Sequence, residues 1–83
     1  MKVVYSDLKN KRVFISGGGS GIGATIVEHF CEQKSEVYFI DIDLKSSNKL
    51  IKNIKKKGYR VPKFIECNIL DVKKLQNIIK NII

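Results

Sequence analysis

Residues 16–23, with the sequence Ser-Gly-Gly-Gly-Ser-Gly-Ile-Gly, restrict the fold of this 83-residue chain more than any other segment. An apolar run over residues 12–15 precedes them, and an amphipathic run over residues 22–30 follows. Glycine adopts the positive φ of tight turns, and its missing Cβ lets a ligand approach the backbone. A helix that begins at such a turn directs unpaired N–H groups and its positive dipole end toward it. The segment therefore predicts a strand–turn–helix unit that binds a phosphate group.

The rest of the chain alternates between short apolar runs and longer amphipathic runs. Strands are expected over residues 12–16, 36–41 and 61–68, and helices over residues 22–33, 44–57 and from 72 onward. Gly58 follows the second helix in the usual C-terminal position, and Asp71 is a suitable N-cap for the third. The order β-α-β-α-β-α predicts an α/β fold with a parallel sheet, right-handed crossovers and strand order 3-2-1. Residues 1–83 are expected to form one small domain, in which the third helix covers the second face of the sheet nearly alone. The expected core positions include Leu8 in the lead-in and the apolar face of the first helix, with Ile22, Ile26, Val27 and Phe30.

The spacing of the glycines distinguishes between kinds of nucleotide site. Residues 19–24 fit the pattern G-x-G-x-x-A, whereas Gly17, Gly21 and Gly23 fit G-x-x-x-G-x-G. A P-loop is excluded, because no lysine follows the glycines at the position that it requires. A strand before the turn and a helix after it favour a dinucleotide-binding turn over glycines that merely pack a helix against a strand.

Asp41 ends the second expected strand, twenty residues after Gly21. In a dinucleotide fold, such a carboxylate accepts hydrogen bonds from the adenosine ribose hydroxyls and repels a 2′-phosphate. Ile42 follows Asp41 and Ser20 lies in the turn, so neither position offers a cation for the additional phosphate of NADP. These charges predict NAD as the cofactor rather than NADP.

The glycine segment resembles the Thr-Gly-x-x-x-Gly-Ile-Gly signature of short-chain dehydrogenases/reductases, with Ser16 in place of the threonine. Residues 8–13, Asp41 and residues 67–71 also lie where that family has matching features. The resemblance extends from Val4 onward and is greatest to NAD-dependent sugar 1-dehydrogenases, the xylose dehydrogenase type among them. It implies a Rossmann-like sheet, of which this chain would be the first half, truncated at its C-terminal side.

The resemblance also implies a set of cofactor contacts. The pyrophosphate and nearby ribose would be held by Gly17, Ser20, Gly21, Ile22 and Gly23. The adenosine would be framed by Asp41 and Ile42, and the adenine amine would meet Asn68, beside Ile69. The family usually has aspartate where this chain has Asn68, whose amide oxygen still accepts a hydrogen bond but carries no charge.

The activity implied by the resemblance is hydride transfer between a nicotinamide and an alcohol or ketone, with a sugar as one candidate substrate. The family's catalytic Ser, Tyr and Lys would lie beyond residue 83, so no catalytic residue is expected here. Tyr5 and Lys9, and likewise Tyr59 and Lys63, match Tyr-x-x-x-Lys by letter. Neither pair lies on a helix, as that motif needs, and Pro62 interrupts the second pair. We therefore expect a fragment that binds cofactor without turnover and that forms homo-oligomers only at full length.

Three alternatives stay open. The first is a module that senses NAD without catalysis, and the second is a methyltransferase-like fold, which also pairs a glycine turn with an acid after its second strand. The third is nucleic-acid binding, since the net charge is +8 and residues 44–65 contain eight basic residues and no acidic residue. No aromatic side chain interleaves with the lysines of residues 44–58, so we interpret them as a solvated helix face rather than a nucleic-acid site.

Composition excludes several further classes of function. Cys31 and Cys67 lie far apart and, with the single His29, do not have the spacing of a zinc site. We expect both to be buried free thiols and His29 to be a surface residue, with no metal bound. No apolar run approaches the roughly 20 residues of a membrane span, and no signal peptide is evident, so a cytoplasmic protein is expected. On folding, a chain of this size buries only about 60% of the surface that its unfolded form exposes, which predicts marginal stability.

Overall fold

A computed structural model describes residues 9–82 and contains three strands and three helices in strict alternation. The elements are β1 (Arg12–Ser16), α1 (Gly21–Glu32), β2 (Glu36–Asp41), α2 (Leu44–Lys56), β3 (Lys63–Glu66) and α3 (Val72–Ile82). The predicted α/β class and the position of each element are confirmed. The third strand is shorter than the expected residues 61–68 at both ends. Residues 61 and 62 precede the sheet, where Pro62 cannot donate a ladder hydrogen bond, and residues 67 and 68 follow the strand. Leu8, the expected core residue of the lead-in, lies outside the described residues.

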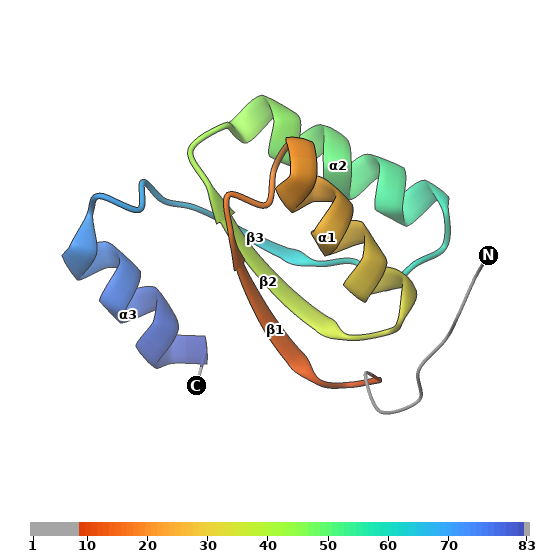
Figure 1. Cartoon of the computed structure of the whole chain (residues 1–83), viewed down its shortest axis with the longest axis horizontal. Helices are drawn as coiled ribbons and strands as arrows, with labels where there is room; N and C mark the ends of the chain where they lie inside the picture. The colour runs from red at the N-terminus through yellow and green to blue at the C-terminus, as the bar shows by residue number, and fades with distance from the viewer. Residues whose placement is uncertain (1–8, 83) are drawn as a thin grey trace.

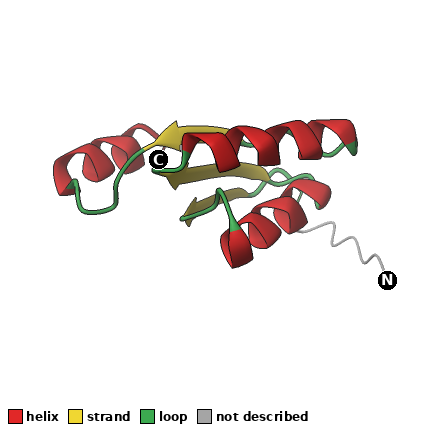
Figure 2. Ribbon diagram, turned by 90° about the horizontal axis from the view of Figure 1, so that it is seen from above, coloured by secondary structure: helices red, strands yellow, loops and turns green. Residues whose placement is uncertain are grey.

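The sheet is parallel, with β2 between β1 and β3, which confirms the expected strand order. Val13 pairs with Val37 in the β1–β2 register, and Phe39 pairs with Phe64 in the β2–β3 register. Figure 2 shows the three strands side by side, with their arrows pointing the same way. All three carboxyl ends therefore meet at one edge of the sheet, where open α/β folds bind their ligands.

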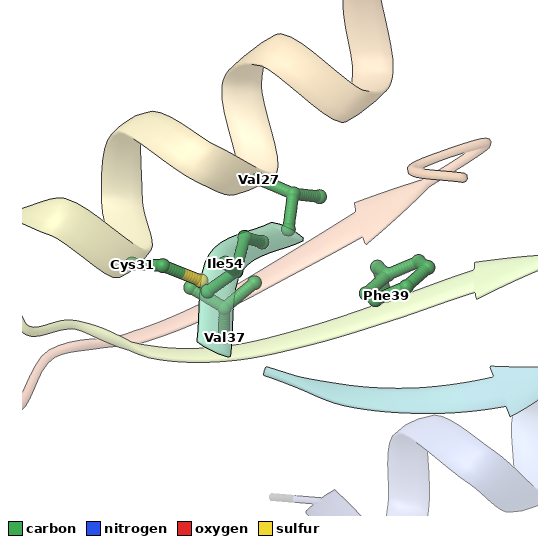
Figure 3. Packing of buried hydrophobic residues seen from close by; sticks show 5 residues of the cluster. All are labelled: Val27, Cys31, Val37, Phe39 and Ile54. Atoms are coloured by element: carbon green, nitrogen blue, oxygen red, sulfur yellow. The ribbon is translucent and has the colours of Figure 1, made fainter. Parts of the chain in front are cut away.

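The main core lies between the sheet and the two helices α1 and α2, which cover one face (Figure 1). Its fully buried members come from both helices and from the central strand: Val27, Cys31, Val37, Phe39 and Ile54 (Figure 3). Phe39 also stacks on Phe64 with ring centroids 5.1 Å apart. Because successive strand side chains alternate between faces, Val37 and Phe39 enter this core while Tyr38 lies on the opposite face.

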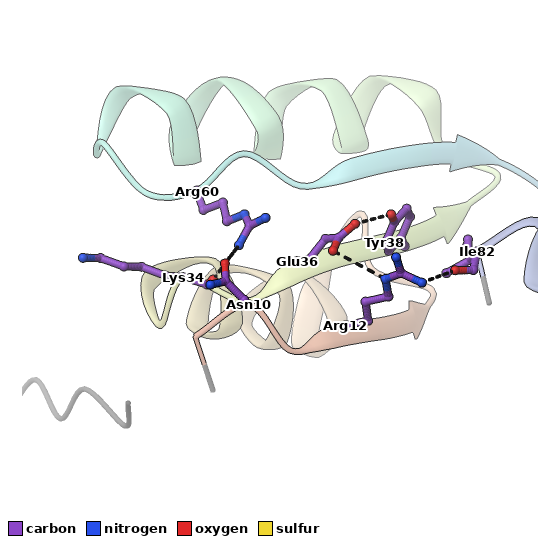
Figure 4. A network of polar contacts seen from close by, with 7 residues as sticks. All are labelled: Asn10, Arg12, Lys34, Glu36, Tyr38, Arg60 and Ile82. Atoms are coloured by element: carbon purple, nitrogen blue, oxygen red, sulfur yellow. Dashed lines mark hydrogen bonds and ion pairs between the residues drawn. The ribbon is translucent and has the colours of Figure 1, made fainter. Parts of the chain in front are cut away.

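The opposite face of the sheet carries a polar network (Figure 4). The Tyr38 hydroxyl donates a hydrogen bond to Glu36, whose pKa is lowered chiefly by that bond. Arg12 lies 3.5 Å from Glu36 and donates to the Ile82 carbonyl oxygen at 2.7 Å, which ties the end of α3 to β1. Before the amino ends of β1 and β3, Arg60 donates a hydrogen bond to the side chain of Asn10 at 2.7 Å.

The helix α3 lies across the sheet from α1 and α2 (Figure 1), and none of its described residues is buried. The expectation that it alone covers the second face therefore holds only in part, since Phe14 of β1 stays 37% exposed. A second expectation, that Ile22 and Ile26 belong to the buried face of α1, is wrong. Ile22 is 81% exposed, because the first turn of α1 projects beyond the sheet edge on the glycine turn.

Candidate functional site

A cavity of about 320 Å³ opens at the carboxyl ends of the three strands. Its lining comes from the end of β1, the end of β2 and the loop after β3: Ser16, Gly17, Ile40, Asp41, Ile42, Cys67, Asn68 and Ile69. Five of the nine predicted contact residues are in this lining, although they are spread over 53 positions of sequence from Gly17 to Ile69. The parallel register brings them to one place.

Asp41 connects the glycine turn to the loop that precedes α2. Its Oδ2 accepts a hydrogen bond from the Gly19 backbone N–H at 2.9 Å, and its Oδ1 accepts from the Asp43 N–H at 2.8 Å. A carboxylate offers about four lone-pair positions, so two remain for a ligand. The side chain is partly exposed and borders the cavity, so a diol bound there could donate hydrogen bonds to it.

Asp43, in turn, caps the N-terminus of α2. Its carboxylate accepts from the Ser46 N–H at 3.0 Å and from the Ser46 hydroxyl at 2.8 Å. These bonds favour the charged form, and the bond from the Ser46 backbone is the largest cause of the lowered pKa of Asp43. The cap determines where α2 begins, and the bond from the Asp43 N–H to Asp41 holds the capping residue in place.

The glycine turn is held by close backbone contacts. The N–H groups of Gly17 and Gly18 both donate to the Ile40 carbonyl oxygen, at 2.8 and 3.2 Å. Gly17 and Gly21 adopt φ values of +68° and +59°, which other residues rarely tolerate. A Cβ at Gly23 would overlap the Gly17 carbonyl oxygen, so α1 can approach the end of β1 this closely only with glycine there.

Asn68 follows β3 at the third side of the cavity and is exposed. Its side-chain oxygen accepts a hydrogen bond from the Leu70 N–H at 2.9 Å, and its backbone oxygen accepts from Asp71. Ile42 and Ile69 are 65% and 56% exposed and present apolar surface to the opening. The arrangement combines two apolar edges with one carboxylate and one amide.

The other four predicted contact residues lie outside this cavity lining. Ser20 borders a separate depression of about 230 Å³ between the turn and α2. Gly21 and Ile22 are exposed at the start of α1, and Gly23 lies beneath the turn. Ser20 precedes α1 but makes no side-chain cap, so its hydroxyl is not committed to the helix end.

Sequence reasoning missed Ser47. This residue of the first turns of α2 is fully buried, and its Oγ has no hydrogen-bond partner among the described residues. The only sequence signal is size, since Ser46 and Ser47 interrupt a helix of mostly long side chains. The hydrogen bond from the Gly19 backbone N–H to the Asp41 carboxylate was not predictable from the sequence either.

The cysteines, the histidine and the described Tyr-x-x-x-Lys pair, Tyr59 and Lys63, lie away from the cavity lining, apart from Cys67, which borders the cavity. Cys31 and Cys67 are buried and free, as predicted, and His29 is exposed. Tyr59 and Lys63 do not share a helix, since α2 ends at Lys56 and β3 begins at Lys63. Tyr5 lies outside the described residues. Residues 9–82 include no cluster of His, Cys, Asp and Glu suited to a metal, and none of their helices has the length and apolarity of a membrane span.

The parallel sheet, glycine turn and strand-end aspartate define an α/β protein of the dinucleotide-binding type. The model of the short chain dehydrogenase family matches residues 11–83, so the chain belongs to that family. The resemblance inferred from the glycine segment is thereby confirmed. Members of this family are oxidoreductases that use a nicotinamide dinucleotide.

Individual relatives agree with this membership. The protein named probable galactose dehydrogenase GalD of Rhizobium meliloti is 38% identical over 68 residues, which are 82% of this chain and 27% of that protein. The D-xylose 1-dehydrogenase of Caulobacter vibrioides is 56% identical over 39 residues, 47% of this chain and 16% of the enzyme. The chain thus spans about a quarter of the length of the first relative.

Solved structures support the fold. A betaketoacyl-[ACP] reductase (FabG) from Bacteroides thetaiotaomicron superposes with a TM-score of 0.81 at 25% identity, over 89% of this chain and 36% of that one. A short chain dehydrogenase from Mycobacterium smegmatis gives 0.81 at 18% identity, over 94% and 33% of the two chains. At such identities the likeness shows the architecture, not the substrate.

Proposed function

We propose that residues 1–83 are the NAD-binding part of a short-chain dehydrogenase/reductase. The observation that carries this proposal is the position of Asp41, at the end of β2, where it borders the cavity and holds the glycine turn. A carboxylate there matches the two hydroxyls of an adenosine ribose and opposes a 2′-phosphate. No described cation faces Asp41 from the cavity lining to reverse that preference.

The residues present fit a dinucleotide. The turn leaves a backbone surface that a Cβ at Gly23 would disrupt, and the exposed N-terminus of α1 offers N–H groups to a pyrophosphate. Ile42 and Ile69 supply apolar edges for an adenine ring, and Asn68 supplies a polar group beside them. When bound, the nicotinamide would accept or donate a hydride.

We further propose that the whole protein acts on an alcohol or ketone, with a sugar hydroxyl as the favoured substrate. The support is the names of two relatives, a probable galactose dehydrogenase and a D-xylose 1-dehydrogenase. The 83 residues contain no Tyr and Lys that share a helix within the described part, so this chain alone is expected to bind cofactor without turnover.

Calorimetric titration of the 83-residue chain with NAD and with NADP tests the cofactor proposal. NAD is expected to bind at least tenfold more tightly, because Asp41 accepts from the free 2′-hydroxyl but repels a phosphate. Asp41→Asn is expected to weaken NAD binding and to reduce the preference between the two dinucleotides. Equal affinity of the unmodified chain for NAD and NADP would overturn the assignment of Asp41.

Asp71→Asn is the matched control for this experiment. Like Asp41, Asp71 is an aspartate whose carboxylate accepts a backbone N–H, here from Lys74 at 3.2 Å, but it is exposed and lies at the start of α3. Asparagine is an equally good N-cap, so the substitution removes one charge without removing the cap. Its NAD affinity is expected to equal that of the unmodified chain.

A further inference from the structure

The buried hydroxyl of Ser47 is the one described side-chain oxygen or nitrogen that is buried without a hydrogen-bond partner. A serine inside a helix commonly donates to the carbonyl four residues earlier, here that of Asp43. That carbonyl accepts the Ser47 backbone N–H at 3.1 Å, as in any α-helix, but the Ser47 hydroxyl does not donate to it. A buried unsatisfied hydroxyl costs free energy, so its presence calls for a physical reason.

Ser47 lies against the same point of the glycine turn as the Asp41 carboxylate. A Cβ built at Gly19 would overlap the Ser47 Oγ and would lie 3.0 Å from Asp41 Oδ2. Only a glycine therefore lets the hydroxyl and the carboxylate approach from two elements, α2 and β2.

The Gly19 N–H donates to Asp41 Oδ2 at 2.9 Å. A ribose diol can donate to the lone pairs of Asp41 that remain free, and the orientation of the carboxylate then decides how well both hydroxyls are bound. The Ser47 hydroxyl rotates freely about its C–O bond and carries one donor. The hydroxyl and Oδ2 both lie beside the Cβ position of Gly19, so a small rotation of the carboxylate can bring them within hydrogen-bond distance.

We propose that Ser47 is a positioning residue for the cofactor, whose hydroxyl donates to Asp41 Oδ2 when a dinucleotide ribose engages that carboxylate. This inference rests on the proposed NAD-binding function. Ser47 does not touch the cofactor; it holds the carboxylate that does. Its hydroxyl is unpaired in the free chain and paired in the complex, so it links ligand binding to the start of α2.

The variant Ser47→Ala separates this role from a purely structural one. Removing an unpaired buried hydroxyl is expected to leave the free chain at least as stable to heat as the unmodified chain. The same variant is expected to bind NAD about tenfold more weakly, because the carboxylate loses a charge-assisted donor. A structural hydrogen bond would instead lower thermal stability and affinity together.

Ser46→Ala is the matched control, since Ser46 is the neighbouring serine and its hydroxyl is already bonded to Asp43. It is expected to lower thermal stability slightly and to leave the NAD affinity within twofold of the original. A double-mutant cycle with Asp41→Asn tests the pathway: Ser47→Ala should have little further effect on NAD affinity once the carboxylate is gone.

Each outcome has a distinct meaning. If the unmodified chain binds NAD and Ser47→Ala binds it equally well, the inference about Ser47 is wrong while the proposed function stands. A Ser47→Ala chain that is less stable than the original, or that does not fold, also overturns the inference, because the hydroxyl then has a partner without ligand. If the unmodified chain binds neither dinucleotide, the proposed function fails and the inference fails with it.

Discussion

At the scale of single residues, the role of a side chain depends on its hydrogen-bond partners. Asp41 illustrates the range, since the sequence predicts a ribose acceptor and the structure adds two backbone N–H groups that the same carboxylate already binds. Its position after β2 follows from the apolar run before it, so that part was predictable. The tie to Gly19 was not, because the two residues are 22 positions apart and meet only through the parallel register.

Cys31 gives a prediction at the residue scale. Burial raises its pKa from 9.0 to about 12, with a further contribution from the nearby charge of Glu28. Above pH 9 the unfolded chain loses the thiol proton while the folded chain keeps it, so stability falls as pH rises toward 12, by about 1.4 kcal/mol per pH unit at most. Cys31→Ala should reduce this alkaline loss, as measured by urea unfolding at pH 8 to 11.

The control for this experiment is Cys67→Ala, which removes the other buried thiol. Both variants are expected to lose stability at pH 7, because each leaves space in a packed region. The measured quantity is the slope of stability against pH, which is expected to become shallower in Cys31→Ala. Parallel slopes for the original chain and Cys31→Ala would contradict the role of this thiol.

At the scale of secondary-structure elements, α1 is joined to the end of β1 by close backbone contacts at the glycine turn. The periodicity of apolar residues predicted all three helices, and Gly58, with a φ of +77°, ends the second as expected. The same periodicity placed Ile22 on the buried face of α1, which is wrong. Periodicity describes a helix but not how far it extends past the sheet, and the turn carries this helix beyond the edge.

Gly23→Ala tests the contact between α1 and β1. The added methyl group would overlap the Gly17 carbonyl oxygen, which belongs to the backbone and cannot move aside without displacing the turn. We expect a loss of about 3 kcal/mol in the free energy of unfolding, measured by urea denaturation, together with loss of NAD binding.

Gly58→Ala is the comparison, because nothing lies within 4 Å of its added Cβ and only its positive φ opposes the substitution. It is expected to cost about 1 kcal/mol and to leave NAD affinity unchanged. If Gly23→Ala were no more harmful than Gly58→Ala, the close approach of α1 to β1 would not be essential.

The whole molecule is an asymmetric layered structure. One face of the sheet is closed by α1 and α2, whereas the other carries α3, which buries none of its described residues. Exposed apolar side chains on and before α3 include Ile69, Leu70 and Val72, and β1 forms an open edge of the sheet. Exposed apolar surface and free edges favour association between copies.

Val72→Lys tests this consequence. Val72 is 58% exposed, so a lysine there can extend into solvent and is expected to change the melting temperature little. It should reduce concentration-dependent self-association of the 83-residue chain, measured by sedimentation equilibrium. Lys73→Ala, which removes a neighbouring charge and adds no polar surface, should not reduce it. A chain that is monomeric at every concentration would contradict the expectation.

The amino-acid sequence by itself determined the order and type of the elements, the glycine turn and the family, because these depend on local periodicity and on backbone conformations that only certain residues adopt. The tertiary structure decided which residues meet. It gathers Gly17, Asp41 and Asn68 around one cavity, leaves Ile22 in solvent and buries the Ser47 hydroxyl beside Asp41. Those contacts depend on the strand register and on how closely α1 and α2 approach the sheet, which no local pattern contains.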